Sequence, residues 1–340
     1  MQKIRVAVFF GNVSPEHEVS CSSAEGIIQN INRSRFSVKE IYIDKKGRFL
    51  TGRNVLKSIN CGEKNKLSQL NLNKLIHEID VAFPVLHGQG GEDGAIQGFL
   101  QTLGIPFVGA SVLASALCLD KTIFNQLMVV NKIFKPKFII LDNERQTADE
   151  RIWISKEIKK LQLPLFVKPA RAGSSVGISK VKHFIDLKKA ILKAKNYDQK
   201  IIIEESVEDA IEIEVSVFGN TARDVKVSLP GRIIPGAEFY TYNDKYKDNK
   251  TRFELPARLS KRKIAEIRRV AKRAYLIANC QGLARVDFLL NKDKKVYLNE
   301  INTLPGFTSI SMYPKLWRIS GLSFRQLLTK LIHLALKRKT

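Results

Sequence analysis

The chain has 340 residues, of which 44% are hydrophobic and 26% charged, and its formal net charge at pH 7 is +24. This length predicts two or three domains, and the composition excludes a disordered, collagen-like or coiled-coil protein. No apolar run is long enough to span a bilayer and the N-terminus has no signal-peptide cleavage site, so we expect no membrane partner. The cysteines are far apart and lack metal-binding spacing, which predicts reduced thiols in a cytoplasmic protein.

The excess of basic residues raises the question of an anionic partner. Lysine and arginine gather in two helix-like stretches, residues 186–200 and 261–275. The sequence contains no RNA-binding motif with interleaved aromatic residues, no zinc-finger spacing and no basic region leading into heptads. We therefore expect solvated helix faces, with binding to nucleic acid as the alternative.

Predicted strands and helices alternate over the first 120 residues. Residues 4–11, IRVAVFFG, form a nearly all-apolar run that ends in Gly, which is typical of a buried parallel strand. We expect further strands at 36–44, 81–88 and 104–110, a helix at 18–31 and another between the last two strands. This alternation indicates an α/β layer architecture.

The rest of the chain divides into a central and a C-terminal section. The central section continues the alternation, with helices near 121–131 and 184–194 and strands at 166–170 and 201–205. The last section is richer in strands, at 211–219, 225–233, 282–290 and 296–302, with a basic helix at 260–278 and a terminal helix. We predict an N-terminal α/β domain (1–120), a central subdomain (121–212) and an α+β C-terminal subdomain (213–340).

A hairpin near the C-terminus predicts a cation site. If Asp293-Lys294 forms a two-residue loop, Leu290 pairs with Tyr297, Asp287 faces Glu300 and Arg285 faces Asn302. These last four side chains then project from one face, where two directly opposed carboxylates destabilise the sheet. Asp287, Glu300 and Asn302 supply the oxygen ligands that Mg²⁺ prefers, with Arg285 beside them as a donor to developing negative charge. The alternative is an exposed acidic face paired with lysines.

A second candidate site is FVKPARAGSSVGISKV at residues 166–181. The predicted strand ends at Lys168, and the Gly-Ser-Ser run after it lets backbone N–H groups approach a phosphate closely. The stretch matches neither a P-loop nor a dinucleotide fingerprint, so an ordinary loop remains the alternative.

Three other polar stretches follow or end predicted strands. His87 begins a glycine-rich loop at the carboxyl end of a strand, where open α/β sheets bind ligands, although a capped turn stabilised by Glu92 and Asp93 is the alternative. Glu16 either holds a substrate ammonium group or stabilises the first turn of a helix. Residues 201–215 concentrate acidic side chains, and Glu204 either faces a nucleotide or belongs to an exposed acidic edge.

Six motifs, in order along nearly the whole chain, resemble those of the D-alanine–D-alanine ligase family, which belongs to the ATP-grasp superfamily. They are GNVSPEHEVS (11–20), HGQGGEDGAIQG (87–98), VGASVLASALCLDK (108–121), VKPARAGSSVG (167–177), YTYNDKY (240–246) and NEINTLPGFTSISMYP (299–314). The resemblance implies a three-part ATP-grasp fold that holds ATP between its central and C-terminal parts. It also implies a cytoplasmic homodimer that joins two D-alanines for peptidoglycan synthesis, through a D-alanyl phosphate, with release of ADP and phosphate.

The resemblance also implies roles for individual residues. ATP would be bound by Lys121, Lys168, Ser175, Glu204, Glu205, Val207 and Glu212, with both lysines at the phosphates. Two Mg²⁺ or Mn²⁺ ions would be held by Asp287, Glu300 and Asn302, and the oxyanion by Arg285 and the N–H of Gly306. Glu16 would orient the first D-alanine's ammonium, with His87 near its carboxylate and Ser311 at the second carboxylate. A lid carrying Lys245 and Tyr246 would be linked through Ser174 to Glu16.

Two departures from the family pattern leave details open. Ile211 stands where many members carry Arg, and Asn243-Asp244 replaces a more usual Glu-Ala in the lid.

The nearest alternative function is a D-Ala–D-Ser or depsipeptide ligase on the same scaffold. Depsipeptide-forming relatives carry His at the position of Tyr246, so this sequence predicts an amine nucleophile. A nicotinamide-dependent oxidoreductase is excluded because no GxGxxG motif follows the first strand. A nucleic-acid-binding protein that kept the scaffold is disfavoured because every expected ligase position is filled.

Overall fold

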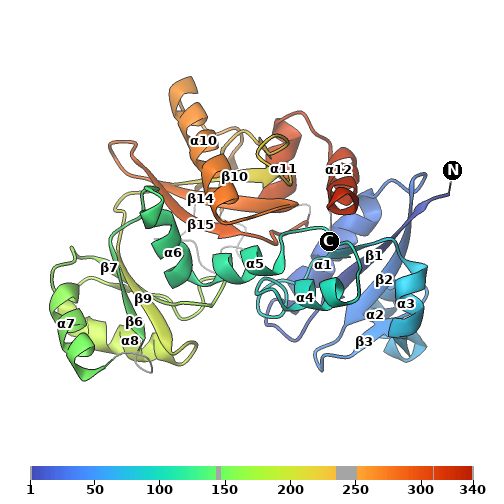
Figure 1. The fold of residues 1–340 in the computed structure, drawn as a ribbon, viewed down its shortest axis with the longest axis horizontal. Helices are drawn as coiled ribbons and strands as arrows, with labels where there is room; N and C mark the ends of the chain where they lie inside the picture. The colour runs from blue at the N-terminus through green and yellow to red at the C-terminus, as the bar shows by residue number, and fades with distance from the viewer. Residues whose placement is uncertain (1, 143–146, 235–250, 309, 339–340) are drawn as a thin grey trace.

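A computed structural model describes residues 2–142, 147–234, 251–308 and 310–338. Figure 1 shows an N-terminal sheet at one end of the molecule and a central sheet at the other, with a third sheet between and above them. This arrangement confirms a predicted fold that is α/β at the N-terminus and mixed α and β further on.

The N-terminal sheet has the strand order β4-β3-β2-β1-β5. β1 (Ile4–Gly11) runs parallel to β2 (Phe36–Ile43) and β5 (Val81–Pro84), whereas β3 (Phe49–Thr51) and β4 (Ser68–Gln69) are antiparallel additions. Val6, Val8 and Phe10 of β1 face one core, and Ala7 and Phe9 face another. This alternation explains the continuous apolar run, because both faces of a parallel sheet are covered.

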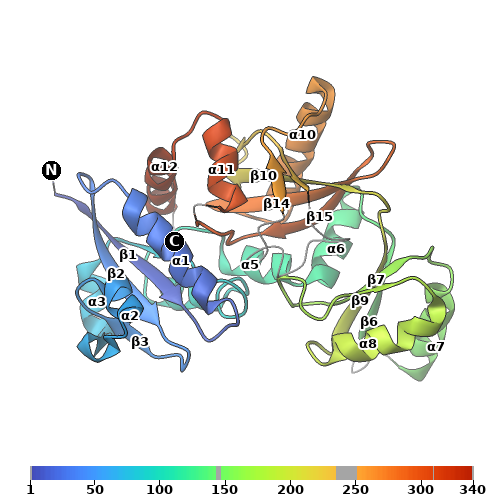
Figure 2. The same ribbon diagram turned by 180° about the vertical axis from the view of Figure 1, so that it is seen from behind.

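Helices cover both faces of this sheet. α1 (His17–Asn30), α2 (Val55–Asn60) and the C-terminal α12 (Phe324–Lys337) pack on one face, and α3 (Leu72–Glu78) and α4 (Ala95–Thr102) pack on the other. The last helix thus shares its core with the first strand, across almost the whole length of the sequence (Figure 2). The single turn η1 (Lys64–Lys66) connects α2 and β4. The domain divisions near residues 120 and 212 remain predictions.

The predicted strand at 104–110 is wrong. Its only pairing is a single parallel bridge between Phe107 and Ala82. Pro106 has no N–H to donate to a ladder, and Gly104 and Gly109 take φ values of +66° and +115°, outside the extended region.

The central sheet is antiparallel, in the order β6-β9-β7-β8. Its strands are β6 (Phe138–Asp142), β7 (Leu165–Pro169), β8 (Ser179–Val181) and β9 (Lys200–Glu205). α7 (Ala148–Ile158), η2 (Phe184–Asp186) and α8 (Leu187–Lys195) belong to the same part, and α5 (Val112–Leu119) and α6 (Lys121–Val130) lead into it.

The third sheet is antiparallel, in the order β13-β12-β10-β14-β15, with β11 paired to β10. Its strands are β10 (Ile211–Phe218), β11 (Lys226–Val227), β12 (Gly231–Ile234), β13 (Arg252–Glu254), β14 (Leu283–Leu290) and β15 (Val296–Asn302). α10 (Lys261–Ile277) packs on Ile213 and Val215, and α11 (Met312–Ile319) follows the sheet. Because side chains alternate along β10, Glu212 and Glu214 point away from α10.

The predicted hairpin between β14 and β15 is correct at the candidate site and wrong at the turn. Asp287 pairs with Glu300 and Arg285 with Asn302, as predicted. Nearer the turn, Tyr297 pairs with Leu289 and not with Leu290, and the register shifts between Asp287 and Phe288. The loop is longer than predicted, with Asn291 N donating to Lys295 O at 3.3 Å. The longer loop shifts the pairing by one residue, and the irregularity between Asp287 and Phe288 restores the predicted pairing at the candidate site.

Within the described residues, no single helix is both long and apolar enough to cross a bilayer. The helix pair α5 and α6 passes that test only together, and it is bent by 98°.

Candidate active site

Two adjoining pockets lie where the three sheets meet. The larger pocket, of about 390 Å³, is lined from the central sheet by Lys168, Glu204 and the loop after β7, and from the third sheet by Glu212 and Asp287. The smaller pocket, of about 130 Å³, is lined by Glu16, His87, Arg285 and Ser311. Lys121, Ser174 and Glu300 line both pockets. A molecule in one pocket would therefore lie next to a molecule in the other.

In the larger pocket, Lys168 on β7 forms an ion pair with Glu204 on the neighbouring strand β9. Both side chains are largely buried, and Asn125 Nδ2 donates to the same carboxylate at 3.5 Å. Burial opposes ionisation of Glu204, but the ammonium groups of Lys168 and Lys135 outweigh it and hold its pKa below the usual range. The Glu204 carboxylate is thus ionised. Lys168, its partner in the ion pair, can also bind an anion that enters the pocket.

Lys135 is a half-buried lysine that the sequence analysis missed. Its Nζ donates to Asn299 O at 2.5 Å, and burial lowers its pKa to about 7. No local motif marks it, because its burial depends on β15, more than 160 residues away. Lys121, at the start of α6, is also half-buried; the burial that it has lowers its pKa, and its Nζ donates to Ala172 O at 2.6 Å.

The glycine-serine loop after β7 is held in an unusual backbone conformation. Ser174 and Ser175 take φ values of +50° and +61°, which non-glycine residues rarely adopt. The Ser174 hydroxyl donates to the Glu16 carboxylate, which comes from the loop between β1 and α1. This contact joins the central part to the N-terminal part at the boundary between the pockets.

Acidic groups surround Arg285 on the third sheet. Its Nη2 lies 2.7 Å from Asp287 Oδ2, and its Nε lies 3.2 Å from Glu214 Oε2. Burial alone would lower the pKa of Arg285, but the carboxylates of Asp287 and Glu214 raise it well above its ordinary value. Glu300, directly opposite Asp287, adds a further carboxylate to the group.

This donor set fits a hard divalent cation. The facing carboxylates of Asp287 and Glu300, with the Asn302 amide on the same strand, offer only oxygen ligands, which suits Mg²⁺ or Mn²⁺. Arg285 carries one positive charge, and several carboxylates surround it. One guanidinium cannot neutralise all of their negative charge. The residues present therefore fit a metal shared with phosphate oxygens.

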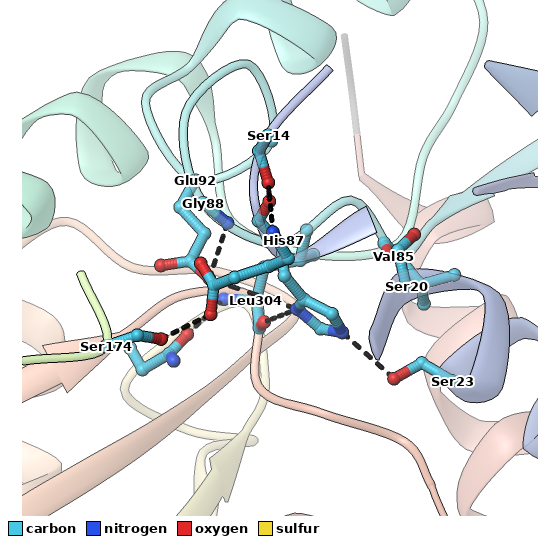
Figure 3. A network of polar contacts seen from close by, with 12 residues as sticks. Ser14, Ser20, Ser23, Val85, His87, Gly88, Glu92, Ser174 and Leu304 are labelled. Atoms are coloured by element: carbon cyan, nitrogen blue, oxygen red, sulfur yellow. Dashed lines mark hydrogen bonds and ion pairs between the residues drawn. The ribbon is translucent and has the colours of Figure 1, made fainter. Parts of the chain in front are cut away.

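His87 is held in a network of neutral hydrogen bonds in the smaller pocket (Figure 3). Its Nδ1 lies 3.1 Å from Leu304 O, and because a carbonyl only accepts, Nδ1 carries the hydrogen. Its Nε2 then accepts from the Ser23 hydroxyl at 2.9 Å, and Ser23 Oγ in turn accepts from Phe307 N at 3.2 Å. Burial lowers the pKa of His87, which keeps the ring neutral.

Glu92 lies beside His87 and not at the start of a helix. Its Oε1 is 3.9 Å from His87 Nδ1 and accepts from Gly88 N at 3.3 Å. Burial, reinforced by the nearby Glu16 carboxylate, raises the pKa of Glu92 to about 8. The helix-stabilising interpretation is therefore wrong for Glu92. It holds for Asp93, whose Oδ1 accepts from Ala95 N at 3.0 Å at the beginning of α4.

The far wall of the smaller pocket is formed by the loop after β15. A Cβ at Gly306 would lie 2.6 Å from Ser311 Oγ, so only glycine fits without moving that serine. Ser311 Oγ accepts from Thr308 N at 3.0 Å, and Ser311 directly precedes α11.

The structure brings nearly all of the predicted site residues together. The larger pocket contains Lys121, Lys168, Ser174, Ser175, Glu204, Glu205, Val207, Glu212, Asp287 and Glu300, and the smaller pocket adds Glu16, His87, Arg285, Asn302, Gly306 and Ser311. The Glu205 carboxylate accepts from Gln162 N at 2.9 Å, and Glu205 N donates to Lys137 O at 2.9 Å. Lys245 and Tyr246 lie outside the described residues.

Two antiparallel sheets enclose a pocket, with lysines on one side of it and carboxylates on the other, and a parallel α/β sheet precedes them in the chain. This arrangement defines an enzyme of the ATP-grasp class. Family models described as "D-ala D-ala ligase N-terminus" and "D-ala D-ala ligase C-terminus" match residues 5–110 and 127–333. The chain belongs to the D-alanine–D-alanine ligase family.

Curated relatives and solved structures agree with this assignment. The chain is 45% identical to D-alanine–D-alanine ligase of Caldicellulosiruptor bescii, over 99% of this chain and 96% of the relative. It is 43% identical to D-alanine–D-alanine ligase B of Clostridium tetani, over 100% and 95%. The fold matches the VanG D-Ala:D-Ser ligase from Enterococcus faecalis with a TM-score of 0.87, at 34% identity over 98% of this chain and 100% of that chain. It matches the D-alanine–D-alanine ligase from Coxiella burnetii with a TM-score of 0.86, at 32% identity over 99% and 95%.

Proposed function

We propose that this protein joins two D-alanine molecules into D-alanyl-D-alanine, with ATP converted to ADP and phosphate, for peptidoglycan precursor synthesis. The observation that carries the proposal is the junction of the two pockets at Lys121, Ser174 and Glu300. ATP in the larger pocket and D-alanine in the smaller pocket would place a γ-phosphate next to a carboxylate.

In the first step, an oxygen of the first D-alanine's carboxylate attacks the γ-phosphorus, and the bond to the β-phosphate oxygen breaks. Both reactants are anionic, so the step needs positive charge around them more than covalent chemistry. Lys121 and Lys168 supply this charge, and Lys168 exchanges the Glu204 carboxylate for a phosphate oxygen when ATP binds. Asp287, Glu300 and Asn302 would hold magnesium, which would neutralise charge on the phosphate oxygens.

Glu16 orients the first D-alanine through its ammonium group, and the Ser174 hydroxyl fixes the Glu16 carboxylate. His87 shapes the carboxylate side of the same subsite. Because Ser23 and Leu304 already engage both ring nitrogens, His87 positions the substrate and does not transfer a proton.

In the second step, the amine of the second D-alanine attacks the carbonyl carbon of the acyl phosphate, and phosphate leaves from the tetrahedral intermediate. Arg285 and the N–H of Gly306 stabilise the negative oxygen of that intermediate. Ser311 holds the carboxylate of the second D-alanine on the far wall of the smaller pocket.

Acyl phosphates hydrolyse in open water, so the site has to close during the reaction. We propose that Lys245 and Tyr246 belong to the closing lid. Replacing Tyr246 by Phe should raise ATP hydrolysis relative to dipeptide formed, measured as the ratio of phosphate to product. An unchanged ratio would remove Tyr246 from the lid. The homodimer, the second metal ion and the cytoplasmic location remain predictions from the family resemblance.

The proposal is tested by phosphate release from ATP and Mg²⁺, with mass analysis of the products. The amino-acid arms are D-alanine alone, L-alanine alone, and D-alanine with D-serine or D-lactate. We expect release that depends on D-alanine, with one D-Ala–D-Ala formed per phosphate. The similarity to a D-Ala:D-Ser ligase makes the mixed dipeptide the second candidate, and its dominance would replace the proposed acceptor. Folded protein without D-alanine-dependent turnover would overturn the function.

A further inference from the structure

A quarter of the unexplained net charge of +24 lies along α10, which has seven basic residues and one acidic residue. The exposed side of this helix carries Lys261, Arg262, Arg268, Arg269 and Arg273, and its opposite side is buried against the third sheet. The one acidic residue of α10, Glu266, is paired with Lys263 at 2.7 Å. Across residues 2–142, 147–234, 251–308 and 310–338, no acidic side chain forms an ion pair with the five exposed cations.

Three neighbouring segments extend this charge, and hydrogen bonds hold each of them against α10. Arg273 Nη2 donates to Asn131 O at 2.6 Å, Lys272 Nζ to Ala222 O at 2.8 Å, and Lys263 Nζ to Lys294 O at 2.6 Å. These segments add the exposed residues Lys132, Arg223, Lys226, Lys294 and Lys295. We call the exposed cations of α10 together with these five residues the basic ridge.

The acidic residue beside the added arginine is bound to its own turn. Asp224 Oδ1 accepts from Thr221 N at 2.6 Å and from Asn220 N at 3.0 Å, which ties the carboxylate to its own turn. The basic ridge is therefore a surface drawn from several elements and not the solvated face of one helix, and its basic residues outnumber the acidic residues Asp224, Glu266 and Asp293 that lie among them.

Exposed apolar side chains lie at the edge of the basic ridge. Val130, at the end of α6, is 79% exposed, and Phe134 is 61% exposed. Both flank Asn131, the residue that Arg273 contacts, and Lys295 Nζ lies 4.4 Å from the centre of the Phe134 ring. Val130 and Phe134 therefore present apolar surface to solvent beside the basic residues.

The basic ridge faces away from the pockets. Ile213 and Val215 of β10 pack with the buried side of α10, whereas Glu212 and Glu214 on the opposite face line the larger pocket. Figure 1 shows α10 projecting from the outer side of the third sheet. A broad surface could contact the ridge while the pockets stay open to substrates.

We propose that the basic ridge docks on a membrane surface rich in anionic lipid, with Val130 and its neighbour Val129 entering the headgroup region. Clustered lysine and arginine attract anionic headgroups, and adjacent aliphatic side chains add apolar burial at the same boundary. Single-stranded nucleic acid is favoured less, because its bases need aromatic platforms and the ring of Phe134 is already covered by Lys295. This docking departs from the sequence-based expectation of no membrane partner and is independent of the ligase reaction.

The test is sedimentation of the full chain with vesicles of phosphatidylcholine containing about a third phosphatidylglycerol, at about 0.05 M and about 0.5 M salt. Pure phosphatidylcholine vesicles and a short single-stranded RNA serve as comparison ligands. The test variant is Arg262→Glu/Arg269→Glu on the ridge. The matched control is Lys188→Glu/Lys189→Glu on α8, another basic helix, whose neighbour Ile185 is 88% exposed.

We expect binding to the anionic vesicles only, weakened by salt. The ridge variant should bind at least about tenfold more weakly, the α8 variant less than about twofold, and Val130→Ser a few-fold. All variants should keep wild-type ligase activity, which shows that they fold. Three results would overturn the proposal: no binding to anionic vesicles, equal losses in both double variants, or ridge-dependent binding to RNA without binding to vesicles.

Discussion

The two pockets are organised by different interactions although they share a wall. In the larger pocket, opposite charges meet across strands, as in Lys168 with Glu204. In the smaller pocket, buried groups are kept neutral, as in His87 held between Ser23 and Leu304 and Glu92 with its raised pKa. A pocket of paired charges can exchange its protein partners for phosphates and cations, whereas a neutral network fixes shape and hydrogen-bond direction. The first arrangement suits ATP, and the second suits recognition of a small amino acid.

The largest expected effect comes from Glu300→Gln, because Glu300 belongs to both pockets. The change removes one of the facing carboxylates from the proposed metal site, and we expect ATP turnover to fall by about a thousandfold. Initial rates over a range of Mg²⁺ concentrations measure it. Turnover within a few-fold of wild type would refute a metal site that depends on Glu300.

Lys168→Met tests the paired charges of the larger pocket. The change leaves Glu204 buried without its strongest partner, and we expect a loss of about 3 kcal/mol in the free energy of unfolding, together with weaker ATP binding. The matched control is Lys292→Met, which breaks a pair with Asp209 whose side chains are 77% and 67% exposed. Denaturant unfolding should show less than about 1 kcal/mol for the control. Equal losses would mean that burial of the Lys168 pair has no special effect.

Glu92→Gln tests the neutral side of the comparison through pH. The folded protein keeps the Glu92 proton up to a pKa of about 8, whereas the unfolded carboxyl releases it near its ordinary value of 4.5. Between these values the folded state binds more protons, so wild-type stability relative to the Gln variant should fall as pH rises, and should level off above pH 8. The direction of this change is the test, and denaturant unfolding of both proteins at low and high pH measures it. A difference independent of pH would contradict the raised pKa.

Ser23→Ala is expected to have the smallest effect. It removes the hydroxyl that donates to His87 Nε2, and we expect a loss of about tenfold in kcat/KM for D-alanine with the KM for ATP unchanged. Ser22→Ala is the matched control, because the Ser22 hydroxyl donates to Glu18 O on the exposed side of α1. A matching rise in the KM for ATP would mean that the two pockets are not organised separately.

The larger pocket was more predictable from the sequence than the smaller one. Strand alternation and a hairpin placed Asp287 opposite Glu300, even though the predicted loop was too short, because the irregularity in the ladder restores the register at the site. The alternation of strands and helices likewise predicted β1, β2, β7 and β9. Pattern reasoning failed at residues 104–110, where Pro106 and the glycines limit the pairing to one bridge.

The neutral network of the smaller pocket could not be predicted, since its members come from distant segments. His87 meets Ser23 on α1 and Leu304 after β15, and no local pattern links these three positions. The same holds for the raised pKa of Glu92, whose causes are burial and the carboxylates of Glu16 and Glu300. Only tertiary packing makes such groups buried, so a sequence shows them as ordinary polar residues.

The central claim is that a D-alanine carboxylate in the smaller pocket is phosphorylated by ATP in the larger one. The most direct test uses D-alanine labelled with ¹⁸O in its carboxylate and follows the label into the released phosphate by mass spectrometry. The account predicts one labelled oxygen in each phosphate, because the oxygen that attacks the γ-phosphorus leaves with it when the amine attacks. Phosphate without label, alongside labelled dipeptide, would show that no acyl phosphate forms and would contradict the account.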